Sequence, residues 1–397
     1  MLATGVDLSP RGLLAAAPPI VDVVISDVIL RKTDPTWRFA LAANPTNPGL
    51  LIELCTEDGT TGLGSAGEIL HLGHGLPEMR AALGAVVPVL LRKETPSEPL
   101  AEIDRIGGPA RAILQMALLD LVARSRNVAA HEILGTRRRD GVELIRILSL
   151  KSPERMAAVA KSHQDEGYRH VKIKLDNAPD DVDFRRVAAI REVCGPDFGM
   201  TVDANQAYTN AEDALRLCER IAPLNVIVFE QPVPADDLDG LEFLTKRSPV
   251  PIEADEAANS LDRVREIVDR HAAHGVSIKV PKLGGVDRAA EAIATCGAAG
   301  LTVRMGAHVG SRLLNAAALQ LAVVAGNLSE PSELAEFARL EDDPIAGLEV
   351  TDGRLLLPGK PGLGVRLSTR NRPEPTHNRS DRNRNAPPLP MNGKDEL

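Results

Sequence analysis

Short apolar runs that each end in a charged residue recur through the second half of the chain at a nearly constant spacing. The first is Val171-Lys172-Ile173-Lys174-Leu175, and later runs end in the same way after steps of 29, 27, 25 and 24 residues counted from Lys174. Each step has room for one strand and one helix, so the spacing predicts parallel strands joined by helices. The charged residues at the run ends are Lys174, Asp203, Glu230, Asp255 and Lys279.

The same alternation begins at Val142 and predicts eight strands in series. A closed barrel accommodates eight strands better than an open sheet, which would leave two unpaired edges. The active site of such a barrel lies at the carboxyl ends of its strands, where the charged residues fall. We expect the strands near residues 143–149, 170–175, 199–204, 226–230, 251–254, 276–280, 301–305 and 332–337.

Before the barrel, the sequence shows both strand-like and helix-like patterns, which predict a separate α+β unit. Apolar and β-branched residues at 20–25 and 49–54 indicate two strands, and turn residues at 56–62 then indicate a hairpin. The polar segment 33–48 is expected to be an exposed loop that is long enough to act as a lid. Helical periodicity follows at residues 76–92 and 109–134.

These two sequence patterns divide the chain into a capping domain and a barrel, and 397 residues are enough for two well-buried cores. The Asn-, Arg- and Pro-rich end has too little apolar content to bury, so we expect it to be disordered. The expected parts are an N-terminal extension at 1–18, an α+β capping domain at 19–140, a barrel at 141–340, a segment returning to the cap at 341–367 and a disordered tail at 368–397.

The composition is that of a globular protein and excludes two classes of partner. The net charge of −9, with mixed signs, argues against a nucleic-acid surface. The sequence contains no run of 18 uncharged apolar residues, so we expect no membrane-spanning segment. The apolar part of residues 1–19 is too short for a convincing signal peptide. The final Lys-Asp-Glu-Leu has the sequence of an ER-retention signal, which has no effect without entry to the secretory pathway. We therefore expect a cytoplasmic protein. We expect buried free thiols at Cys55, Cys194, Cys218 and Cys296, which form no metal or redox spacing.

Carboxylates at three successive strand ends offer hard oxygen ligands to a divalent cation. Because no Cys or His lies among Asp203, Glu230 and Asp255, the set favours Mg²⁺ or Mn²⁺ over Zn²⁺. Ordinary salt bridges at strand ends would explain any one of these residues. They explain less well five charged residues in step with five consecutive strands.

Two lysines are expected to face each other across the barrel mouth, Lys174 from the second strand and Lys279 from the sixth. Residues i and i+2 of a strand share a face, so Lys172 points the same way as Lys174. A partly buried lysine near another cation has a lowered pKa, which suits a general base. The whole set suits abstraction of a proton α to a carboxylate, with a metal stabilising the enediolate.

The strand-end motifs are short but jointly specific. They are Lys-x-Lys at 172–174, Val-Asp-Ala-Asn-Gln at 202–206, Glu-Gln-Pro at 230–232, Ala-Asp-Glu at 254–256 and Ile-Lys-x-x-Lys-x-Gly-Gly at 278–285. Over about residues 20–367 the chain resembles the enolase superfamily, in particular its muconate-lactonizing-enzyme subgroup. The resemblance implies an α/β fold, a (β/α)7β TIM-like barrel with an α+β capping domain. It also implies that Mg²⁺ is held by Asp203, Glu230 and Asp255, and that the acid/base pair is Lys174 and Lys279.

Two neighbours of these positions leave alternatives open. Glu253 and Glu256 flank Asp255, which we prefer as the ligand because the subgroup's Ala-Asp-Glu places it there. Asn205 would either support the metal ligands or serve only as a turn residue.

The chain departs from the subgroup at its seventh strand. Arg304-Met305-Gly306-Ala307-His308 puts His308 where the related mandelate-racemase subgroup carries a catalytic histidine, but the aspartate partner of that histidine is replaced by Lys279. We expect His308 to be a substrate contact or a spare acid, or otherwise a packing residue. On the eighth strand, Glu333 resembles a position that contacts the enolate in some members, and Glu336 competes for that role.

These features predict a Mg²⁺-dependent isomerase, a racemase or epimerase with two lysines on opposite faces of a small carboxylate. We count Lys172 and His308 with the two lysines as catalytic candidates. A cycloisomerase or a syn-dehydratase, in which one lysine does the acid–base work, is the alternative within the class. Two alternatives lie outside this class. One is a non-catalytic binding protein that has retained the charged strand-end residues from an enzyme ancestor. The other is a barrel enzyme in which Lys174 forms a Schiff base with the substrate. The expected partners are the small-molecule substrate and further copies of the chain.

Overall fold

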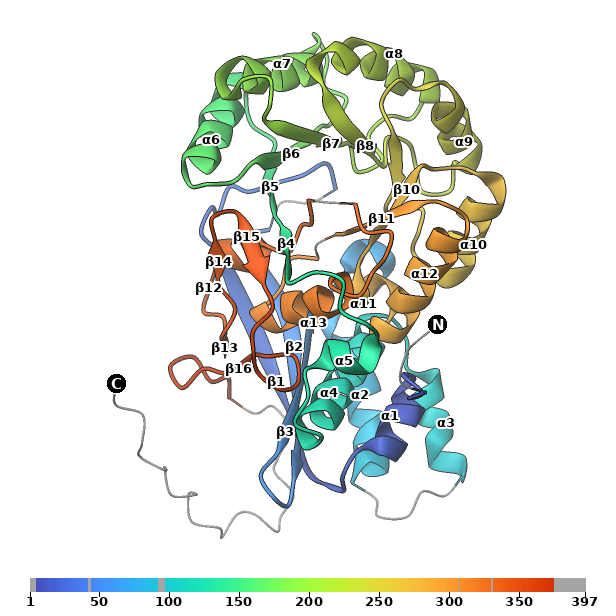
Figure 1. The fold of residues 1–397 in the computed structure, drawn as a ribbon, viewed down its shortest axis with the longest axis vertical. Helices are drawn as coiled ribbons and strands as arrows, with labels where there is room; N and C mark the ends of the chain where they lie inside the picture. The colour runs from blue at the N-terminus through green and yellow to red at the C-terminus, as the bar shows by residue number, and fades with distance from the viewer. Residues whose placement is uncertain (1–4, 42–43, 92–96, 307, 330, 375–397) are drawn as a thin grey trace.

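The computed structural model describes residues 5–41, 44–91, 97–306, 308–329 and 331–374. Within these residues, seven parallel strands form the wall of a barrel, in the spatial order β11-β10-β9-β8-β7-β6-β5 (Figure 1). The first seven predicted strand positions are confirmed. The strands are β5 Ile145–Leu148, β6 His170–Lys174, β7 Gly199–Asp203, β8 Val226–Glu230, β9 Ile252–Ala254, β10 Gly275–Ile278 and β11 Thr302–Met305.

The eighth strand predicted at 332–337 is wrong, because the chain there makes only isolated bridges. Leu328 bridges β11 and Ser332 bridges the residue before β5, both in the parallel sense, so the two edges of the sheet are still connected. Pro331 has no N–H group to donate to a ladder. Soon afterwards the chain turns into a 3-10 helix, η3 Glu336–Arg339.

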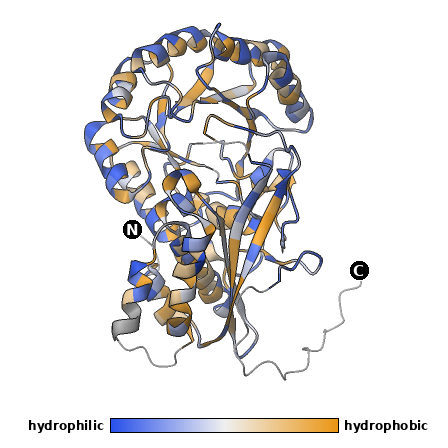
Figure 2. Cartoon of the chain, turned by 180° about the vertical axis from the view of Figure 1, so that it is seen from behind, coloured by the Kyte–Doolittle hydropathy of each residue, from blue (hydrophilic) through white to orange (hydrophobic). Residues whose placement is uncertain are grey.

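Helices follow the barrel strands and cover the outside of the sheet (Figure 1). In α8 the buried residues Ala214, Leu217, Cys218 and Ile221 have the i, i+3, i+4, i+7 spacing of one helix face. Figure 2 shows hydrophilic and hydrophobic stretches alternating along these outer helices. The helices are α6 Pro153–Asp165, α7 Val182–Cys194, α8 Ala211–Ile221, α9 Leu238–Arg247, α10 Leu261–Arg270, α12 Val286–Ala298 and α13 Arg312–Ala322.

The cap is built on an antiparallel sheet in the order β12-β1-β2-β3. Its strands are β1 Ile20–Lys32, β2 Thr46–Thr56, β3 Thr61–Gly67 and β12 Leu340–Glu341. Helix α4 packs so closely on β3 that a Cβ atom at Gly64 would lie 1.9 Å from the carbonyl oxygen of Ile113, so only glycine fits there.

The helices of the first unit differ in part from the prediction. The helix expected at 109–134 ends at Ser125, and a separate short helix follows it. The helix expected at 76–92 is present as α2. The helices are α1 Pro10–Ala16, α2 Leu76–Leu90, α3 Ser97–Arg105, α4 Gly108–Ser125 and α5 Ala130–Leu134, with the 3-10 turn η1 Leu70–Leu72.

The segment after the barrel runs back along the first unit. Strand β12 pairs with β1, and the Leu363 N–H donates to Asp120 of α4 at 2.7 Å. Short strands complete the segment, since β15 pairs with β14 and with β4, and β16 pairs with β13. These strands are β4 Gly141–Glu143, β13 Ile345–Ala346, β14 Val350–Thr351, β15 Arg354–Leu356 and β16 Arg366–Leu367. The predicted disordered tail at 368–397 lies outside the described residues from 375 onward.

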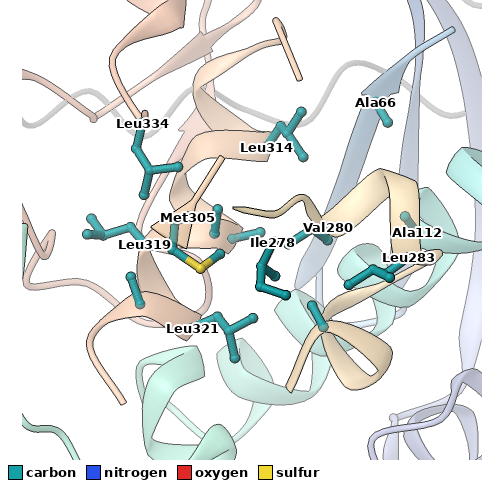
Figure 3. Packing of buried hydrophobic residues seen from close by; sticks show 14 of the residues in the cluster. Ala66, Ala112, Ile278, Val280, Leu283, Met305, Leu314, Leu319, Leu321 and Leu334 are labelled. Carbon is teal, nitrogen blue, oxygen red and sulfur yellow. The ribbon is translucent and has the colours of Figure 1, made fainter. Parts of the chain in front are cut away.

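Cap and barrel share one hydrophobic core beside the mouth. Figure 3 shows Ile278 of β10 and Leu283 of the short helix α11 Val280–Leu283 packing near Ala112 of α4. All three side chains are buried. Burial of apolar surface is the main force that fixes packed elements relative to each other, so this core places the cap loops over the strand ends.

Two further expectations concern cysteines and membranes. Cys194, Cys218 and Cys296 are buried free thiols as predicted, whereas Cys55 is half-buried and not fully buried. Among the described helices, none combines the length and the apolar character that a membrane crossing requires.

Candidate active site

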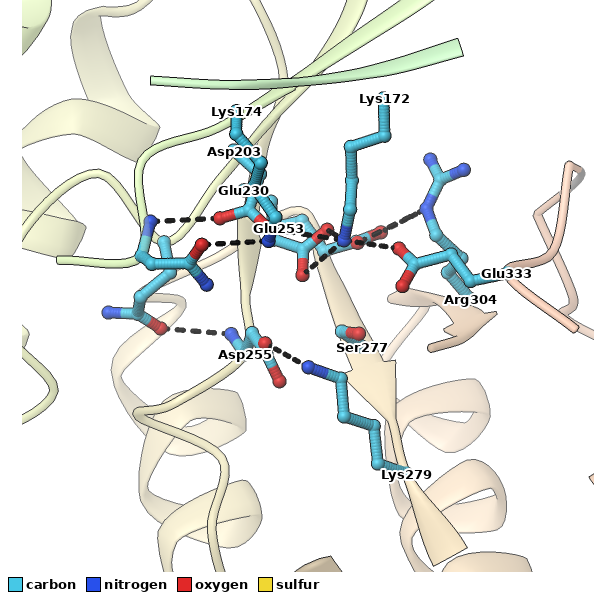
Figure 4. A network of polar contacts seen from close by, with 12 residues as sticks. Lys172, Lys174, Asp203, Glu230, Glu253, Asp255, Ser277, Lys279, Arg304 and Glu333 are labelled. Carbon is cyan, nitrogen blue, oxygen red and sulfur yellow. Dashed lines mark hydrogen bonds and ion pairs between the residues drawn. The ribbon is translucent and has the colours of Figure 1, made fainter. Parts of the chain in front are cut away.

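The register of neighbouring strands sets the predicted charged residues side by side. Lys174 of β6 lies opposite Asp203 of β7, and Asp203 lies opposite Glu230 of β8. Asp255 follows directly after β9, and Lys279 follows β10. Figure 4 shows the five side chains in one polar network, with Lys174 and Lys279 entering it from opposite sides.

Lys172 lies at the centre of this network and is only 1% exposed. Its Nζ is 3.0 Å from Glu230 Oε2, 3.1 Å from Asp203 Oδ2 and 2.6 Å from Glu333 Oε1. Burial alone would lower the pKa of Lys172, but these carboxylates outweigh burial and raise the pKa well above its usual value. Lys172 is therefore a fixed positive charge that holds three acids together.

Lys174 has two partners. Its Nζ donates to Asp203 Oδ2 at 2.5 Å and to Asn205 Oδ1 at 2.7 Å. The amide of Asn205 in turn donates to Glu256 Oε1 at 2.9 Å. Asn205 has a φ of 43°, in the left-handed region that asparagine tolerates better than most residues. Asn205 thus shapes a turn and also holds Lys174, and its support of the metal ligands stays a prediction.

On the other side of the mouth, two lysines share one carboxylate. Lys279 forms an ion pair with Asp255 Oδ2, and Lys282 Nζ lies 2.7 Å from Asp255 Oδ1. Burial would raise the pKa of Asp255, but the two lysines hold it well below its usual range. Burial would lower the pKa of Lys279, but Asp255 and Glu230 raise it instead.

Lys282 is a functional candidate that the sequence reasoning missed. It is 7% exposed, and its Nζ also contacts the main-chain oxygens of Asp255 at 2.7 Å and Ser277 at 3.0 Å. The signal was present, since helix α11 begins right after Lys279 and brings a lysine three residues later to the same side.

The acids that flank Asp255 have different surroundings. Glu253 is 3.2 Å from the Arg304 guanidinium through both of its oxygens, whereas Glu256 lines the cavity at the mouth. One oxygen of Glu256, Oε2, has no hydrogen-bond partner in the part of the chain that the structure describes. Burial and the nearby Asp255 and Asp203 raise the pKa of Glu256 to about 7.

Arg304 itself is a second residue that the sequence did not reveal. It is fully buried on β11 and contacts Glu253 as well as the Pro331 carbonyl oxygen at 2.7 Å. Figure 4 shows Arg304 beside Glu333 and Lys172, so the ionic network extends across the inside of the barrel. The sequence does offer a signal for Arg304, because it is a charged residue within an otherwise apolar strand.

A cavity of about 450 Å³ lies over the network, between the cap and the strand ends. Most described residues between 33 and 45 form an exposed loop, as predicted. The prediction is wrong for Trp37, which lines this cavity and is only 8% exposed, and for residues 46–48, because β2 already begins at Thr46. The expected segment also includes residues 42–43, which lie outside the described residues. The polar and aromatic lining of the cavity includes Lys32, Trp37, Phe39, His71, Lys174, Lys279, Lys282, His308 and Glu333.

His308 lies on the Lys279 side of this cavity. Its ring is 6.4 Å from that of His71 in the cap, and its Nδ1 has no hydrogen-bond partner among the described residues. Burial and the charge of Lys279 hold the pKa of His308 well below its usual value. His308 is therefore a neutral imidazole at the cavity wall.

The two glutamates proposed for the eighth strand point to different places. Glu333 is buried, contacts Lys172 and lines the cavity. Glu336 lies 3.4 Å from Arg339 and is not part of the cavity wall. Of the two, only Glu333 is placed to meet a ligand.

The donor set fits a divalent metal in its chemistry. Asp203, Glu230 and Asp255 offer only oxygen atoms, as hard cations require. Burial and the neighbouring acids raise the pKa of Glu230 well above its usual value, against the effect of Lys172, so added positive charge here would be favourable. Within the described residues, no three acidic, imidazole or thiol groups yet converge on one point. The carboxylates are bound to the lysine ammonium groups and would have to turn toward the ion.

Known proteins share this architecture. Residues 155–371 match the family model described as Enolase C-terminal domain-like. The L-Lys-D/L-Arg epimerase of Methylococcus capsulatus is 31% identical over 360 residues, 87% of this chain and 98% of that protein. Muconate cycloisomerase 1 of Rhodococcus opacus is 29% identical over 360 residues, 88% of this chain and 95% of that protein.

A solved structure extends the comparison to three dimensions. It is the dipeptide epimerase of Enterococcus faecalis complexed with Mg and the dipeptide L-Leu-L-Tyr. The two proteins are 26% identical and superpose with a TM-score of 0.81, over 87% of this chain and 99% of that chain. Both the barrel and the cap of the present chain are thus built as in an isomerase.

Proposed function

Because this chain belongs to the enolase superfamily, among its racemases, epimerases and cycloisomerases, we propose that it is a racemase or epimerase that moves the proton α to a small-molecule carboxylate. The resemblance drawn from the strand-end motifs is confirmed, and so are the fold class and the assignment to the isomerases. One observation carries the finer proposal. Lys174 and Lys279 reach one cavity from β6 and from the end of β10, with three strands between them.

In this proposal the two lysines work on opposite faces of the substrate. The neutral amine of one lysine takes the α proton, and the ammonium group of the other lysine donates a proton to the opposite face, which inverts the stereocentre. Asp203 and Asn205 hold the Nζ of Lys174, and Asp255 holds the Nζ of Lys279. A positioned acid or base of this kind contributes about 10²–10⁴-fold to the rate.

Asp203, Glu230 and Asp255 would hold a divalent metal ion, for which Mg²⁺ is proposed and Mn²⁺ is the alternative. A bound divalent cation would supply positive charge to the substrate carboxylate and so make the α proton more acidic. Lys172 keeps the three acids from repelling one another by contacting two of them and Glu333. His308, as a neutral imidazole at the cavity wall, would contact the substrate.

Proton exchange in D₂O tests this function. The purified protein with added MgCl₂ is incubated with a panel of amino-acid derivatives and dipeptides, and deuterium at the α carbon is measured by NMR or mass spectrometry. We expect exchange together with inversion for at least one compound class, and chelation should stop both. Absence of exchange across the whole panel would contradict the proposal.

Cycloisomerisation is the second candidate, because Muconate cycloisomerase 1 aligns over 88% of this chain. In that reaction a single lysine would do the acid–base work, and the other would act only through its charge. Product analysis separates the two, since a cycloisomerase gives a ring-closed or ring-opened product and a racemase gives the mirror-image substrate.

We also infer that the protein works in the cytoplasm as a homo-oligomer, with a small-molecule carboxylate as its substrate. The free thiols of Cys194, Cys218 and Cys296 support a reducing compartment. Light scattering on the eluted peak of a sizing column checks the oligomeric state, and a monomer would contradict that part of the proposal.

A further inference from the structure

A second cavity, of about 260 Å³, lies outside the ring of strand ends. It is bounded by β5, α6, Arg339 of η3 and the cap segment 33–37 that follows β1. Its lining includes Thr33 and Val159, which are exposed, so a ligand can enter it directly from solvent. We call it the Arg146 cavity, and no step of the proposed proton transfer uses it.

Basic side chains dominate the polar part of this wall. Among the described residues that line the cavity, four are lysines or arginines, whereas Asp34 is the one acid. Asp34 lies 3.4 Å from Lys151, and Arg339 lies 3.4 Å from Glu336, which does not line the cavity. Burial lowers the pKa of Arg339, so a further negative charge would be favourable here. The four basic residues are Lys32, Arg146, Lys151 and Arg339.

Arg146 is the residue that points most directly to a ligand. It is only 7% exposed, and its Nε has no hydrogen-bond partner among the described residues. Its Nη1 donates to the Ala335 carbonyl oxygen at 3.1 Å, and no carboxylate of the described residues lies within ion-pair distance. A buried charged group that leaves a donor unsatisfied is costly, and such exceptions in folded proteins call for an explanation. A bound oxyanion would supply the missing acceptor and the missing charge.

The remaining wall of the cavity is largely apolar and narrows the class of anion. Leu148, Met156 and Val159 line it beside the basic groups. A bare inorganic anion would leave this apolar surface uncovered, whereas the hydrocarbon part of an organic acid would remove it from water. The lining therefore favours an organic carboxylate over phosphate.

We propose that the Arg146 cavity binds a small organic carboxylate as an effector that is separate from the substrate. Such a ligand contacts the barrel through Arg146 and the cap through residues 32–37. The two parts already meet here, since the Thr33 N–H donates to the Arg339 carbonyl oxygen at 3.0 Å. Lys32 and Trp37 also line the main cavity, so a ligand that fixes this segment fixes one wall of the candidate active site. The inference does not depend on the proposed chemistry.

Trp37 is the single tryptophan of the chain, so its fluorescence reports on this wall. The protein is titrated with pentanoate and with pentanamide, which has a similar size but no charge. We expect a saturable change with pentanoate and an affinity for pentanamide that is lower by about tenfold or more, as for a hydrogen-bonded charged group. Equal affinities for the two compounds would overturn the proposal. Phosphate that binds as tightly as pentanoate would overturn the assignment to an organic carboxylate.

Variants locate the ligand, because Trp37 faces both cavities. Arg146→Gln should abolish the preference for pentanoate, and Lys32→Gln should reduce it by a smaller factor. Lys279→Ala and the matched control Arg169→Gln should keep it, because Lys279 lines only the main cavity and Arg169 is an exposed arginine outside both. A preference that is lost in Lys279→Ala and kept in Arg146→Gln would place the ligand in the main cavity and contradict the proposal. If Arg146→Gln does not fold, an unchanged preference in Lys32→Gln refutes it.

Amide hydrogen exchange tests the effect on the cap. Saturating pentanoate should slow exchange in residues 33–37 of the unaltered protein, and the same concentration of pentanamide should not. Pentanoate should have no such effect in Arg146→Gln. Exchange that pentanoate leaves unchanged in the unaltered protein would contradict the effector role.

Discussion

The two sides of the barrel mouth present the same basic residue in different surroundings. On one side, Lys174 is held by one carboxylate and one amide, from Asp203 and Asn205. On the other side, Lys279 shares Asp255 with a second lysine, and the neutral imidazole of His308 lies nearby. Two lysines that we propose as proton-transfer groups are thus positioned by unlike neighbours, so damage to one side should leave the other largely intact.

Loss of a metal ligand should have the largest effect, because both sides depend on it. Asp203→Asn or Glu230→Gln removes one charge from the oxygen donor set and should abolish metal-dependent exchange with either enantiomer. Asp197→Asn is the matched control, since Asp197 is an exposed residue just before β7. Isothermal titration with MgCl₂ provides the measurement. Unchanged Mg²⁺ affinity in both site variants would contradict the assignment of Asp203 and Glu230 as metal ligands.

A smaller effect is expected from Asn205→Ala, and on one side only. The variant removes the amide that links Lys174 to Glu256, so Lys174 loses a hydrogen bond that fixes its Nζ. We expect a loss of roughly tenfold in exchange for the enantiomer served by Lys174, the value of about one hydrogen bond to a charged group. Equal losses for both enantiomers would mean that Asn205 does not act through Lys174.

His308→Gln gives the complementary experiment on the Lys279 side. Its imidazole lines the cavity near Lys279, so we expect a loss of severalfold to about tenfold confined to the other enantiomer. Exchange rates for both enantiomers, measured side by side with the Asn205→Ala protein, give the answer. No change for either enantiomer would leave His308 as a packing residue of the strand end.

The smallest effect concerns stability and should leave both sides of the mouth untouched. Burial and nearby arginines lower the pKa of His170 at the start of β6, against the opposite effect of Glu143. As the pH falls through the ordinary histidine pKa of about 6.5, the unfolded chain takes up a proton that the folded chain refuses, so stability decreases. In His170→Gln, urea unfolding between pH 7.5 and 5.5 should show a shallower decrease. An unchanged slope would assign the effect to other groups.

Much of the mouth could be predicted because it depends on local patterns. Strand and helix periods fix the spacing of Lys174, Asp203, Glu230, Asp255 and Lys279, and parallel register then aligns the strand ends. The eighth strand could not be predicted in this way. Its apolar residues suggested a strand, but Pro331 and the turn of η3 prevent a regular ladder.

The missed residues depend on contacts between distant parts of the chain. Arg304 of β11 pairs with Glu253 of β9, 51 positions away, and the two meet because these strands lie on either side of β10. The pKa of Lys279 is raised mainly by its contact with Asp255, which lies 24 positions away in the sequence. Such pairings are tertiary facts that no single strand pattern contains.

Enantiomer-resolved exchange in Lys174→Ala and Lys279→Ala tests the central claim most directly. Each variant is incubated in D₂O with each enantiomer of an accepted substrate, and deuterium uptake at the α carbon is followed. The two-lysine account predicts that each variant loses about 10²–10⁴-fold in exchange for one enantiomer only, and that the two variants show mirror-image results. Equal loss for both enantiomers in both variants, or loss caused by only one substitution with either enantiomer, would contradict it.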